Sequence, residues 1–332
     1  MRPRITTLTT VLAVLLLAAP LAAGAQQTGK VPRIGMLLPG AAPPPGQPSP
    51  LLDAFRGGLR DLGYVEGQNV VIEYRWSEGR EQRFPDLATD LVRLNVAVIV
   101  TQGAPAVLAA KGASSTIPIV MAFVGDPVGI GVVASLARPG ANITGLSLLD
   151  EDLDGKRIEL LKEAVPGLTR VAILWSANDP GMTLTFNRVE VAARPLGLFL
   201  QSLAVREPGD FPGAFQAAGA GRAKALIVTA QAFTLRHRAQ ILDLAAKHRP
   251  PAMYTLPGFV DAGGLMAYAP SLSDLFRRAA TYVDKVLRGA KPADLPVEQP
   301  TKFEFAINMK TARVLGLTIP PSLLLRVDQL VE

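Results

Sequence analysis

The chain has 332 residues, of which 49% are hydrophobic, 19% charged and 6% aromatic, which suits two domains with large apolar cores. It contains no cysteine, and this excludes disulfides, cysteine-ligated metals, thiol catalysis and a lipid anchor on an N-terminal cysteine. The formal charge of +6 comes from basic residues scattered among acidic ones, without any Lys/Arg block, so the charge does not indicate a nucleic-acid partner.

The first 25 residues predict an export signal. Arg2 and Arg4 supply the positive start, residues 11–17 form a short apolar stretch, and Ala23-Gly24-Ala25 matches the small-residue cleavage site of secreted proteins. The apolar stretch is too short for a membrane span, and no second candidate follows it. We therefore expect residues 1–25 to be a cleaved signal peptide and the mature protein to be periplasmic, with no lipid anchor.

From residue 31 onward, apolar strands alternate with amphipathic helices, as in a doubly wound α/β fold with parallel sheets. Residues 39–50 hold six prolines, two glycines and no charge, which predicts a loop at the carboxyl end of the first strand and at the mouth of a cleft. The first half has expected strands at 31–38, 70–74, 96–100, 117–123 and 142–148, and expected helices at 51–63, 84–94, 104–112 and 128–136.

An acidic run at 150–154 marks the boundary to a second series, and it suits both a hinge exit and the first turn of a helix. This series has expected strands at 170–175, 198–205, 225–229, 252–255 and 263–269, and expected helices at 155–165, 183–195, 211–221 and 235–248. A long helix at 272–287, a strand at 302–308 and short helices at 311–315 and 322–330 are expected to complete the chain.

The two series resemble each other in sequence. The segment Arg33-Ile-Gly-Met-Leu corresponds to Arg170-Val-Ala-Ile-Leu, and three further short matches follow in the same order, all separated by 128 to 137 residues. Shared strand–helix physics produces some such matches, but four in order favour an internal duplication. We therefore predict two Rossmann-like lobes with a ligand cleft between them, because parallel sheets bind ligands outside the carboxyl ends of their strands.

Catalytic groups are scarce in this sequence. The two histidines, His237 and His248, lie eleven residues apart on one expected helix, whereas a metal pair on a helix needs an i, i+4 spacing. No nucleophile elbow and no P-loop occur. The glycine-rich segment 125–131 lacks the dinucleotide-binding spacing, and its Pro127 removes an N–H that a phosphate would need. We expect no enzymatic activity, no metal and no cofactor.

Polar residues at the carboxyl ends of strands are the candidate ligand contacts. Thr101 has an alternative role as a helix cap, and the two roles are compatible because a turn with free N–H groups also binds a carboxylate. Asp126 precedes a proline, as a capping residue often does, and its alternative role is an ion pair with a ligand ammonium. In the first lobe the candidates are Thr101, Gln102, Gly103, Ala104, Gly125 and Asp126.

The second lobe repeats this pattern. Thr229 has the same alternative role as a cap, and Trp175 is either a cleft wall that stacks on a ligand or a packing residue. Free N–H groups near Gly103 and Asn178 are expected to bind the ligand, with Trp175 and Tyr254 covering an apolar side chain. The candidates in this lobe are Trp175, Ser176, Asn178, Thr229, Gln231, Tyr254 and Tyr268.

Seven segments spread over the expected mature chain resemble one known family. The first has the pattern Phe-Arg-x-Gly-Leu-Arg-x-Leu-Gly-Tyr-Val-Glu-Gly-Gln-Asn over 55–69, and another is Asn-Ile-Thr-Gly over 142–145. With these motifs the chain resembles the ABC-transporter substrate-binding proteins of the tryptophan/tyrosine-type family. The seven segments are 55–69, 126–128, 135–140, 142–145, 259–266, 279–292 and 315–321.

The resemblance implies the type I periplasmic binding protein fold, with three hinge crossings near Leu148, Ala269 and Asp294. The first lobe would comprise residues 31–148 and 270–293, and the second lobe residues 149–269 and 294–332. The resemblance also implies closure of the lobes on a small molecule, namely an aromatic or other apolar amino acid or a related small carboxylate. The implied partners are an ABC permease of the inner membrane and its ATPase.

The expected protein is a monomer without a nucleic-acid partner, and two other functions fit the same sequence. A periplasmic sensing subunit for a receptor or kinase would share the fold and differ only in its docking surface. An exported α/β enzyme would need a nucleophile or an acid–base pair in the cleft, and Asp126 has no evident His or Lys partner in the sequence.

Overall fold

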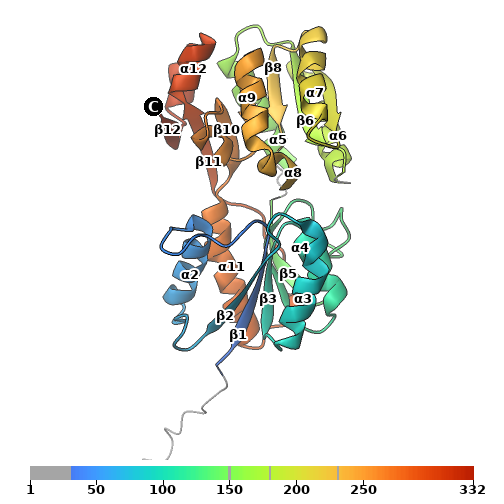
Figure 1. Cartoon of the computed structure of the whole chain (residues 1–332), viewed down its shortest axis with the longest axis vertical. Coiled ribbons are helices and arrows are strands. Elements are labelled where there is room, and N and C mark those ends of the chain that lie inside the picture. Colours follow the sequence, from blue (N-terminus) through green and yellow to red (C-terminus); the bar gives the residue numbers. More distant parts are fainter. Residues whose placement is uncertain (1–30, 149–150, 179–180, 230–231) are drawn as a thin grey trace, which may run out of the picture.

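The structure is a computed structural model that describes residues 31–148, 151–178, 181–229 and 232–332, so the expected signal peptide lies outside the described residues. The described chain forms two lobes, each a β-sheet with helices on both faces (Figure 1). In the first lobe five parallel strands have the order β2-β1-β3-β4-β5. They are β1 (Arg33–Leu38), β2 (Val71–Trp76), β3 (Val98–Gln102), β4 (Ile119–Val124) and β5 (Ile143–Ser147).

Within the described residues, the second lobe has a seven-stranded sheet in the order β12-β11-β10-β9-β8-β6-β7. Every neighbouring pair of strands is parallel except β10 and β11, so β11 and β12 run opposite to the other five strands. The strands of this sheet are β6 (Arg170–Ser176), β7 (Phe199–Val205), β8 (Ala225–Val228), β9 (Ala252–Tyr254), β10 (Met266–Pro270), β11 (Phe303–Asn308) and β12 (Gln329–Val331).

The helices cover both faces of each sheet and bury the apolar sides that the sequence pattern predicts. In the first lobe they are α2 (Pro50–Asp61), α3 (Phe84–Arg93), α4 (Ala104–Ala113) and α11 (Leu272–Leu287). In the second lobe they are α5 (Glu151–Ala164), α6 (Gly181–Ala193), α7 (Asp210–Ala220), α8 (Ala232–Arg236), α9 (Arg238–His248), α10 (Gly258–Asp261), α12 (Met309–Leu315) and α13 (Pro321–Leu324).

Both lobes are built on the same strand order. The order β2-β1-β3-β4-β5 of the first lobe recurs as β7-β6-β8-β9-β10 in the second, so β1 corresponds to β6, β3 to β8 and β4 to β9. These pairs carry three of the four matches found in the sequence. The shared topology therefore supports the predicted internal duplication.

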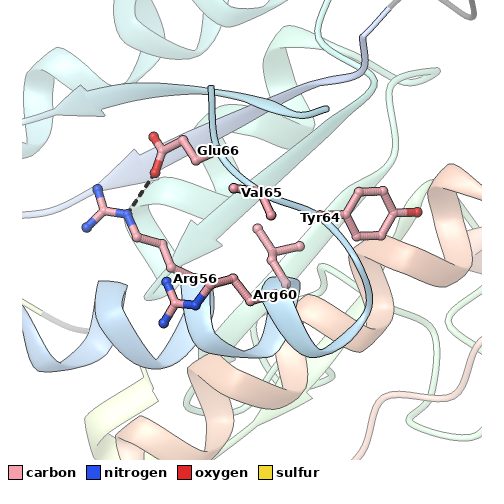
Figure 2. A pocket seen from close by; sticks show the side chains of 6 residues that line it. Arg56, Arg60, Tyr64, Val65 and Glu66 are labelled. Atoms are coloured by element: carbon pink, nitrogen blue, oxygen red, sulfur yellow. Dashed lines mark hydrogen bonds and ion pairs between the residues drawn. The ribbon is translucent and has the colours of Figure 1, made fainter. Parts of the chain in front are cut away.

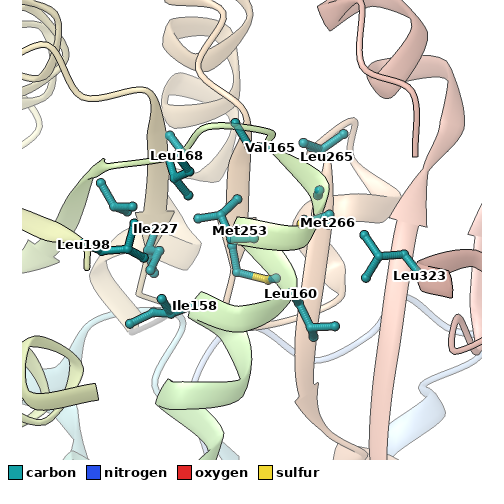
Figure 3. Close-up of a cluster of buried hydrophobic side chains, with 14 of the residues drawn as sticks. Ile158, Leu160, Val165, Leu168, Leu198, Ile227, Met253, Leu265, Met266 and Leu323 are labelled. Atoms are coloured by element: carbon teal, nitrogen blue, oxygen red, sulfur yellow. The ribbon is translucent and has the colours of Figure 1, made fainter. Parts of the chain in front are cut away.

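One buried cluster of the second lobe lies between its sheet and α5, and another packs the sheet against α7, α9 and α10. Ile158 and Leu161 of α5 pack with Ile227 of β8 and Met253 of β9, all of them at most 2% exposed (Figure 3). At about 25 cal/mol for each Å² of apolar surface removed from water, such clusters supply the main stabilisation of the lobe. They fix the ends of the strands on which the candidate site residues lie.

Helix α11 belongs to the first lobe although it follows ten strands of the chain. Phe276 and Val283 of α11 are fully buried in one cluster with residues of α2, β1 and β3. Ser271 caps the helix, because its Oγ accepts from the N–H of Asp274 at 3.3 Å. After α11, Val297 also packs into a first-lobe cluster and Glu298 bridges to Leu146. The third crossing therefore follows Glu298, whereas the sequence analysis placed it near Asp294.

The 55–69 motif fastens α11 to the first lobe. Gly58 lets the two helices approach, because a Cβ at this position would lie 2.5 Å from the carbonyl oxygen of Arg277. The hydroxyl of Tyr64 donates to Asp284 of α11 at 3.0 Å, and Arg56 pairs with Glu66 at 2.8 Å (Figure 2). The motif is thus explained by packing between helices rather than by contact with a ligand.

The two adjacent glycines of α2 provide a matched test of this packing. Alanine gains the same helix propensity at both positions, but at Gly58 its Cβ clashes with backbone, whereas at Gly57 it meets only the flexible ends of Arg277 and Arg60. We expect Gly58→Ala to lower the free energy of unfolding by about 1–3 kcal/mol and Gly57→Ala to leave it unchanged or raise it by up to about 1 kcal/mol. Urea unfolding measures both values, and equal effects would contradict the packing role.

Three expected helices differ from the structure. Residues 128–136 form turns, because Asp126 caps the N–H of Gly129 and Gly131 takes a positive φ of 70°. The expected helix 235–248 is two helices, α8 and α9, that meet at His237. The end of the expected helix 322–330 is the strand β12, which pairs with β11. The short helix α10 was not expected.

Candidate functional site

The carboxyl ends of β1 to β5 in the first lobe and of β6 to β10 in the second point toward the other lobe, whereas those of β11 and β12 point away from it. β5 is parallel to β4 and leads into the first crossing, so the carboxyl ends of β1 to β5 lie at the edge that adjoins the second lobe. β10 is parallel to β9 and leads into the second crossing, so the carboxyl ends of β6 and β8 to β10 lie at the edge that adjoins the first lobe. Figure 1 shows the two lobes end to end in this arrangement. Polar groups at these two edges form the candidate site.

In the first lobe, the end of β3 combines an unsatisfied hydroxyl with an uncapped helix. Thr101 is fully buried, and its Oγ1 has no hydrogen-bond partner among the described residues. It does not cap α4, whose N-cap is Gly103 with a φ of 82° and no side-chain bond. The N–H of Ala104 is one of the first-turn donors that an α-helix leaves unpaired. The pairing register also shifts between Thr101 and Gln102, an irregularity of the kind found beside binding sites.

The end of β4 has a structural explanation in this conformation. The Oδ1 of Asp126 accepts from the N–H of Gly129 at 2.8 Å and so fixes the turn that replaces the expected helix. The carbonyl of Gly125 accepts from the hydroxyl of Ser147 at 3.2 Å. Asp126 thus forms a cap-like bond, but in a turn and not at the start of the expected helix, and a contact between Asp126 and a ligand stays a prediction.

In the second lobe, the polar candidates are bonded within their own lobe. Asn178 is exposed, and its Nδ2 donates to the carbonyl of Arg206 at 2.7 Å. The Oγ1 of Thr229 donates to the carbonyl of Leu174 at 3.1 Å, and its alternative role as a cap involves residues outside the described part of the chain. Ser176 is 2% exposed at the end of β6. Gln231 lies outside the described residues.

Of the three aromatic candidates, Tyr254 is a core residue. It is 1% exposed and its ring stacks on Phe259 with 4.7 Å between centroids, because β9 is a central strand buried on both faces. This burial raises the pKa of the phenol. The expectation that Tyr254 covers a ligand side chain is therefore wrong for this conformation.

Trp175 and Tyr268 are partly exposed and pack against neighbouring rings. The Nε1–H of Trp175 donates to Ser202 at 2.9 Å and its ring stacks on Phe186, which supports the packing role over the role of a free cleft wall. Tyr268, in the middle of β10, stacks on Phe303 with 5.8 Å between centroids. Trp175 is the last but one residue of β6 and so lies near the edge that adjoins the first lobe. Contact with a ligand stays a prediction for both residues.

Sequence reasoning missed a turn at the end of β2. Ser77 is fully buried and its Oγ has no partner among the described residues, as for Thr101. In the strand order, β2 and β3 flank β1, so the two unsatisfied hydroxyls lie on either side of the strand from which the Pro-rich loop 39–50 leaves. The signal in the sequence was a serine directly after the strand, two residues before Gly79.

One cavity lies away from this edge, and it is too small to be the solute-binding site. It has a volume of about 130 Å³ and lies between α2 and the following turn, lined by Arg56, Leu59, Arg60, Tyr64, Val65 and Glu66 (Figure 2). Ligand pockets typically measure about 300–1,000 Å³, so this cavity is too small for a solute of amino-acid size. Over the described part of the chain, no group of three His, Cys, Asp or Glu side chains is placed to hold a metal ion.

Comparison with known proteins identifies the family of this chain. The family model described as "ABC transporter substrate binding protein" matches residues 50–331. The chain belongs to this family of substrate-binding proteins. Its members bind a solute outside the cytoplasm, and no helix in the described residues of this member has the length and apolarity to cross a bilayer.

Three relatives show how far the likeness extends. A protein of Clostridioides difficile (strain R20291) named "Tyrosine-binding protein" is 24% identical over 272 residues, which is 81% of this chain and 78% of that protein. A solved ABC domain in complex with L-Trp, from Streptococcus pneumonia, has a TM-score of 0.81 and 25% identity and covers 91% of this chain and 100% of its own.

A leucine-binding protein from Thermotoga maritima has a TM-score of 0.61 at 13% identity, over 86% of this chain and 87% of its own. At this identity the likeness concerns the fold alone, and the fold is that of type I periplasmic binding proteins, as the sequence predicted. The substrate-binding role that the sequence predicted is likewise confirmed by the family.

Proposed function

We propose that this substrate-binding protein is the periplasmic solute receptor of an ABC importer. It captures an aromatic or other apolar amino acid, or a related small carboxylate, between its lobes and delivers it chemically unchanged to a membrane permease. The observation that carries the proposal is the meeting of two strand edges, with the unsatisfied Thr101 hydroxyl and the uncapped start of α4 on one of them. The tyrosine-binding and L-Trp-bound relatives support an aromatic solute.

Physical chemistry gives this edge a preference for anionic groups. The start of α4 offers the N–H groups of Ala104 and Ala106, although Pro105 between them has none, and the positive end of the helix dipole. Gly103 brings the backbone close without a side chain. A carboxylate accepts such bonds and lies where an N-cap side chain would otherwise be. The Thr101 hydroxyl is already desolvated, so a bond to it would require no further loss of water from that group, but it is fully buried and a solute reaches it only if the turn between β3 and α4 opens.

A thermal-shift and calorimetry screen against the twenty amino acids and their keto- and hydroxy-acid analogues tests the proposal. A solute that binds only the folded state raises Tm with its concentration. We expect aromatic or large apolar amino acids to raise Tm, and the solute to be recovered unchanged after prolonged incubation. Chemical conversion of the solute, or no shift with any compound of these classes, would contradict the proposal.

Thr101→Val separates the role of the hydroxyl in binding from its role in folding. The hydroxyl has no partner, so its replacement by a methyl group of similar size leaves the free energy of unfolding unchanged or slightly higher. We expect the affinity for the solute to fall by about tenfold, as for the loss of one buried hydrogen bond. Calorimetry measures the affinity, and urea unfolding measures the stability.

Thr144→Val is the matched control. The hydroxyl of Thr144, equally buried on β5, donates to the carbonyl of Leu295 at 2.6 Å. This variant should lose about 1–3 kcal/mol of stability and keep the affinity of the folded protein, which is the opposite pattern. An unchanged affinity in Thr101→Val would remove Thr101 from the site.

A further inference from the structure

Arg236 is the last residue of α8 in the second lobe, and its guanidinium lies against the backbone of the first lobe at Gly79. A Cβ built on Gly79 would lie 3.0 Å from Nη2 and 3.3 Å from Nε of Arg236, so the guanidinium covers the open side of this glycine. Gly79 follows β2, and α8 follows β8 in the other lobe. Figure 1 shows α8 at the end of the second lobe that adjoins the first. The contact therefore joins the lobes outside the three crossings.

The turn that receives Arg236 is shaped for this contact. Glu78 and Gly79 both have positive φ, 53° and 71°, which turns the chain sharply at the end of β2. The N–H of Glu78 donates to the carbonyl of Gly40, which fixes the turn to the start of the Pro-rich loop. A Cβ at position 79 would crowd the guanidinium, and Arg236 would have to shift by a few tenths of an ångström to accommodate it. Glycine is thus favoured here by its positive φ and by the close approach of Arg236.

Among the described residues, no carboxylate of the second lobe forms an ion pair with Arg236. No carboxylate in the described part of the first lobe does so either, whereas the neighbouring Arg238 donates to the carbonyl of Gly258 at 2.9 Å within the second lobe. On the other side, Glu78 is held by Arg80 at 2.6 Å and Arg83 at 2.7 Å, and these bonds lower the pKa of its carboxyl. The guanidinium thus lies beside a turn whose carboxylate remains ionised.

We propose that Arg236 is a positioning residue that bridges the two lobes before any solute binds and holds them partly closed. The bridge limits how far the two strand edges separate, so less conformational free energy is lost when a solute closes the lobes. The bridge itself does not depend on the proposed function, but its effect on affinity rests on it.

Interlobe distances in the solute-free protein test the bridge directly. The chain has no cysteine, so Asp86→Cys on α3 and Gln216→Cys on α7 introduce two unique labelling positions, both exposed, one in each lobe. Pulsed electron paramagnetic resonance of the spin-labelled pair gives the distance distribution. We expect Arg236→Met to shift this distribution to longer distances and to broaden it.

Gly79→Ala perturbs the same contact from the other lobe, because its methyl group would lie 3.0 Å from Nη2 of Arg236 and crowd the guanidinium. It should shift the distribution in the same direction, and the double variant should shift no further than Arg236→Met alone. Arg238→Met, which removes a neighbouring arginine without touching the first lobe, should leave the distribution unchanged. A distribution in Arg236→Met identical to that of the parent protein would overturn the proposal.

The effect on binding is a separate measurement. For a solute found in the screen, Arg236→Met should weaken binding by up to about fivefold, the range of an exposed charged contact. If no solute is found, the proposed function fails, but the interlobe distances still show whether Arg236 bridges the lobes. If a solute closes the parent protein but Arg236→Met shows the parent's distances without solute, only the bridge fails.

Discussion

Gly145→Ala is expected to lower the free energy of unfolding by about 3–5 kcal/mol, the largest effect of a single methyl group that we predict for this protein. Gly145 lies in β5 with a φ of 130°, a conformation that residues with a side chain rarely adopt. A Cβ there would lie 2.3 Å from the carbonyl oxygen and 2.5 Å from the backbone nitrogen of Met121 on β4. Neither atom can move without breaking the pairing of β4 and β5.

Gly140→Ala is the control that separates strain from clash. Gly140 also has a positive φ, 87°, but the nearest atom to its Cβ position is 3.6 Å away. This variant should lower the free energy of unfolding by about 1 kcal/mol, because it adds only the strain of a side chain at positive φ and no clash. Urea unfolding followed by circular dichroism compares the two variants with the parent protein, and a loss in Gly145→Ala no greater than that in Gly140→Ala would contradict the steric argument.

Local sequence patterns predicted the parts of the fold that local chemistry determines. The strands are continuous apolar runs because both faces of a parallel sheet are covered, and the pattern at Val98 to Gln102 reports this directly. The same local reasoning gave a helix at 128–136, where Val132 and Val133 have the apolar character of a helix face. In the structure both residues are buried, but both of their N–H groups bond to the carbonyl of Pro127 in successive turns.

The parts that were missed depend on contacts between distant segments. β12 forms because Asp328 exchanges hydrogen bonds with the backbone of Phe305 on β11, a pairing that neither segment predicts alone. Tyr254 is the exception, because its place in a short apolar run of a central strand could have indicated burial. The contact between Gly79 and Arg236 joins two lobes and leaves no local pattern, so only coordinates reveal it.

The second large effect is expected at a buried ion pair beside the first two crossings. Arg157 of α5 is 8% exposed, and its Nη1 donates to Asp154 at 2.9 Å. Its Nε donates to the carbonyl of Tyr268 at 2.8 Å, in the middle of β10. The side chain thus joins the helix that follows the first crossing to the strand that precedes the second. Arg188 approaches the same carboxylate at 3.8 Å and is more exposed.

Arg157→Met should lower the free energy of unfolding by about 3 kcal/mol, because it leaves a buried carboxylate and a buried carbonyl without their main donor. Lys156→Met is the matched control on the adjacent position, where the pair with Glu159 at 3.1 Å is exposed, and it should change stability by less than about 0.5 kcal/mol. Urea unfolding measures both variants against the parent protein.

The double variant Asp154→Leu with Arg157→Met distinguishes a stabilising ion pair from a burial penalty. Removal of both charges leaves no buried ion that lacks a partner, so the double variant should be more stable than Arg157→Met alone by about 1–2 kcal/mol. Arg188 keeps access to water in that variant and adds little cost of its own. A double variant less stable than the single one would show that Asp154 stabilises α5 independently of Arg157.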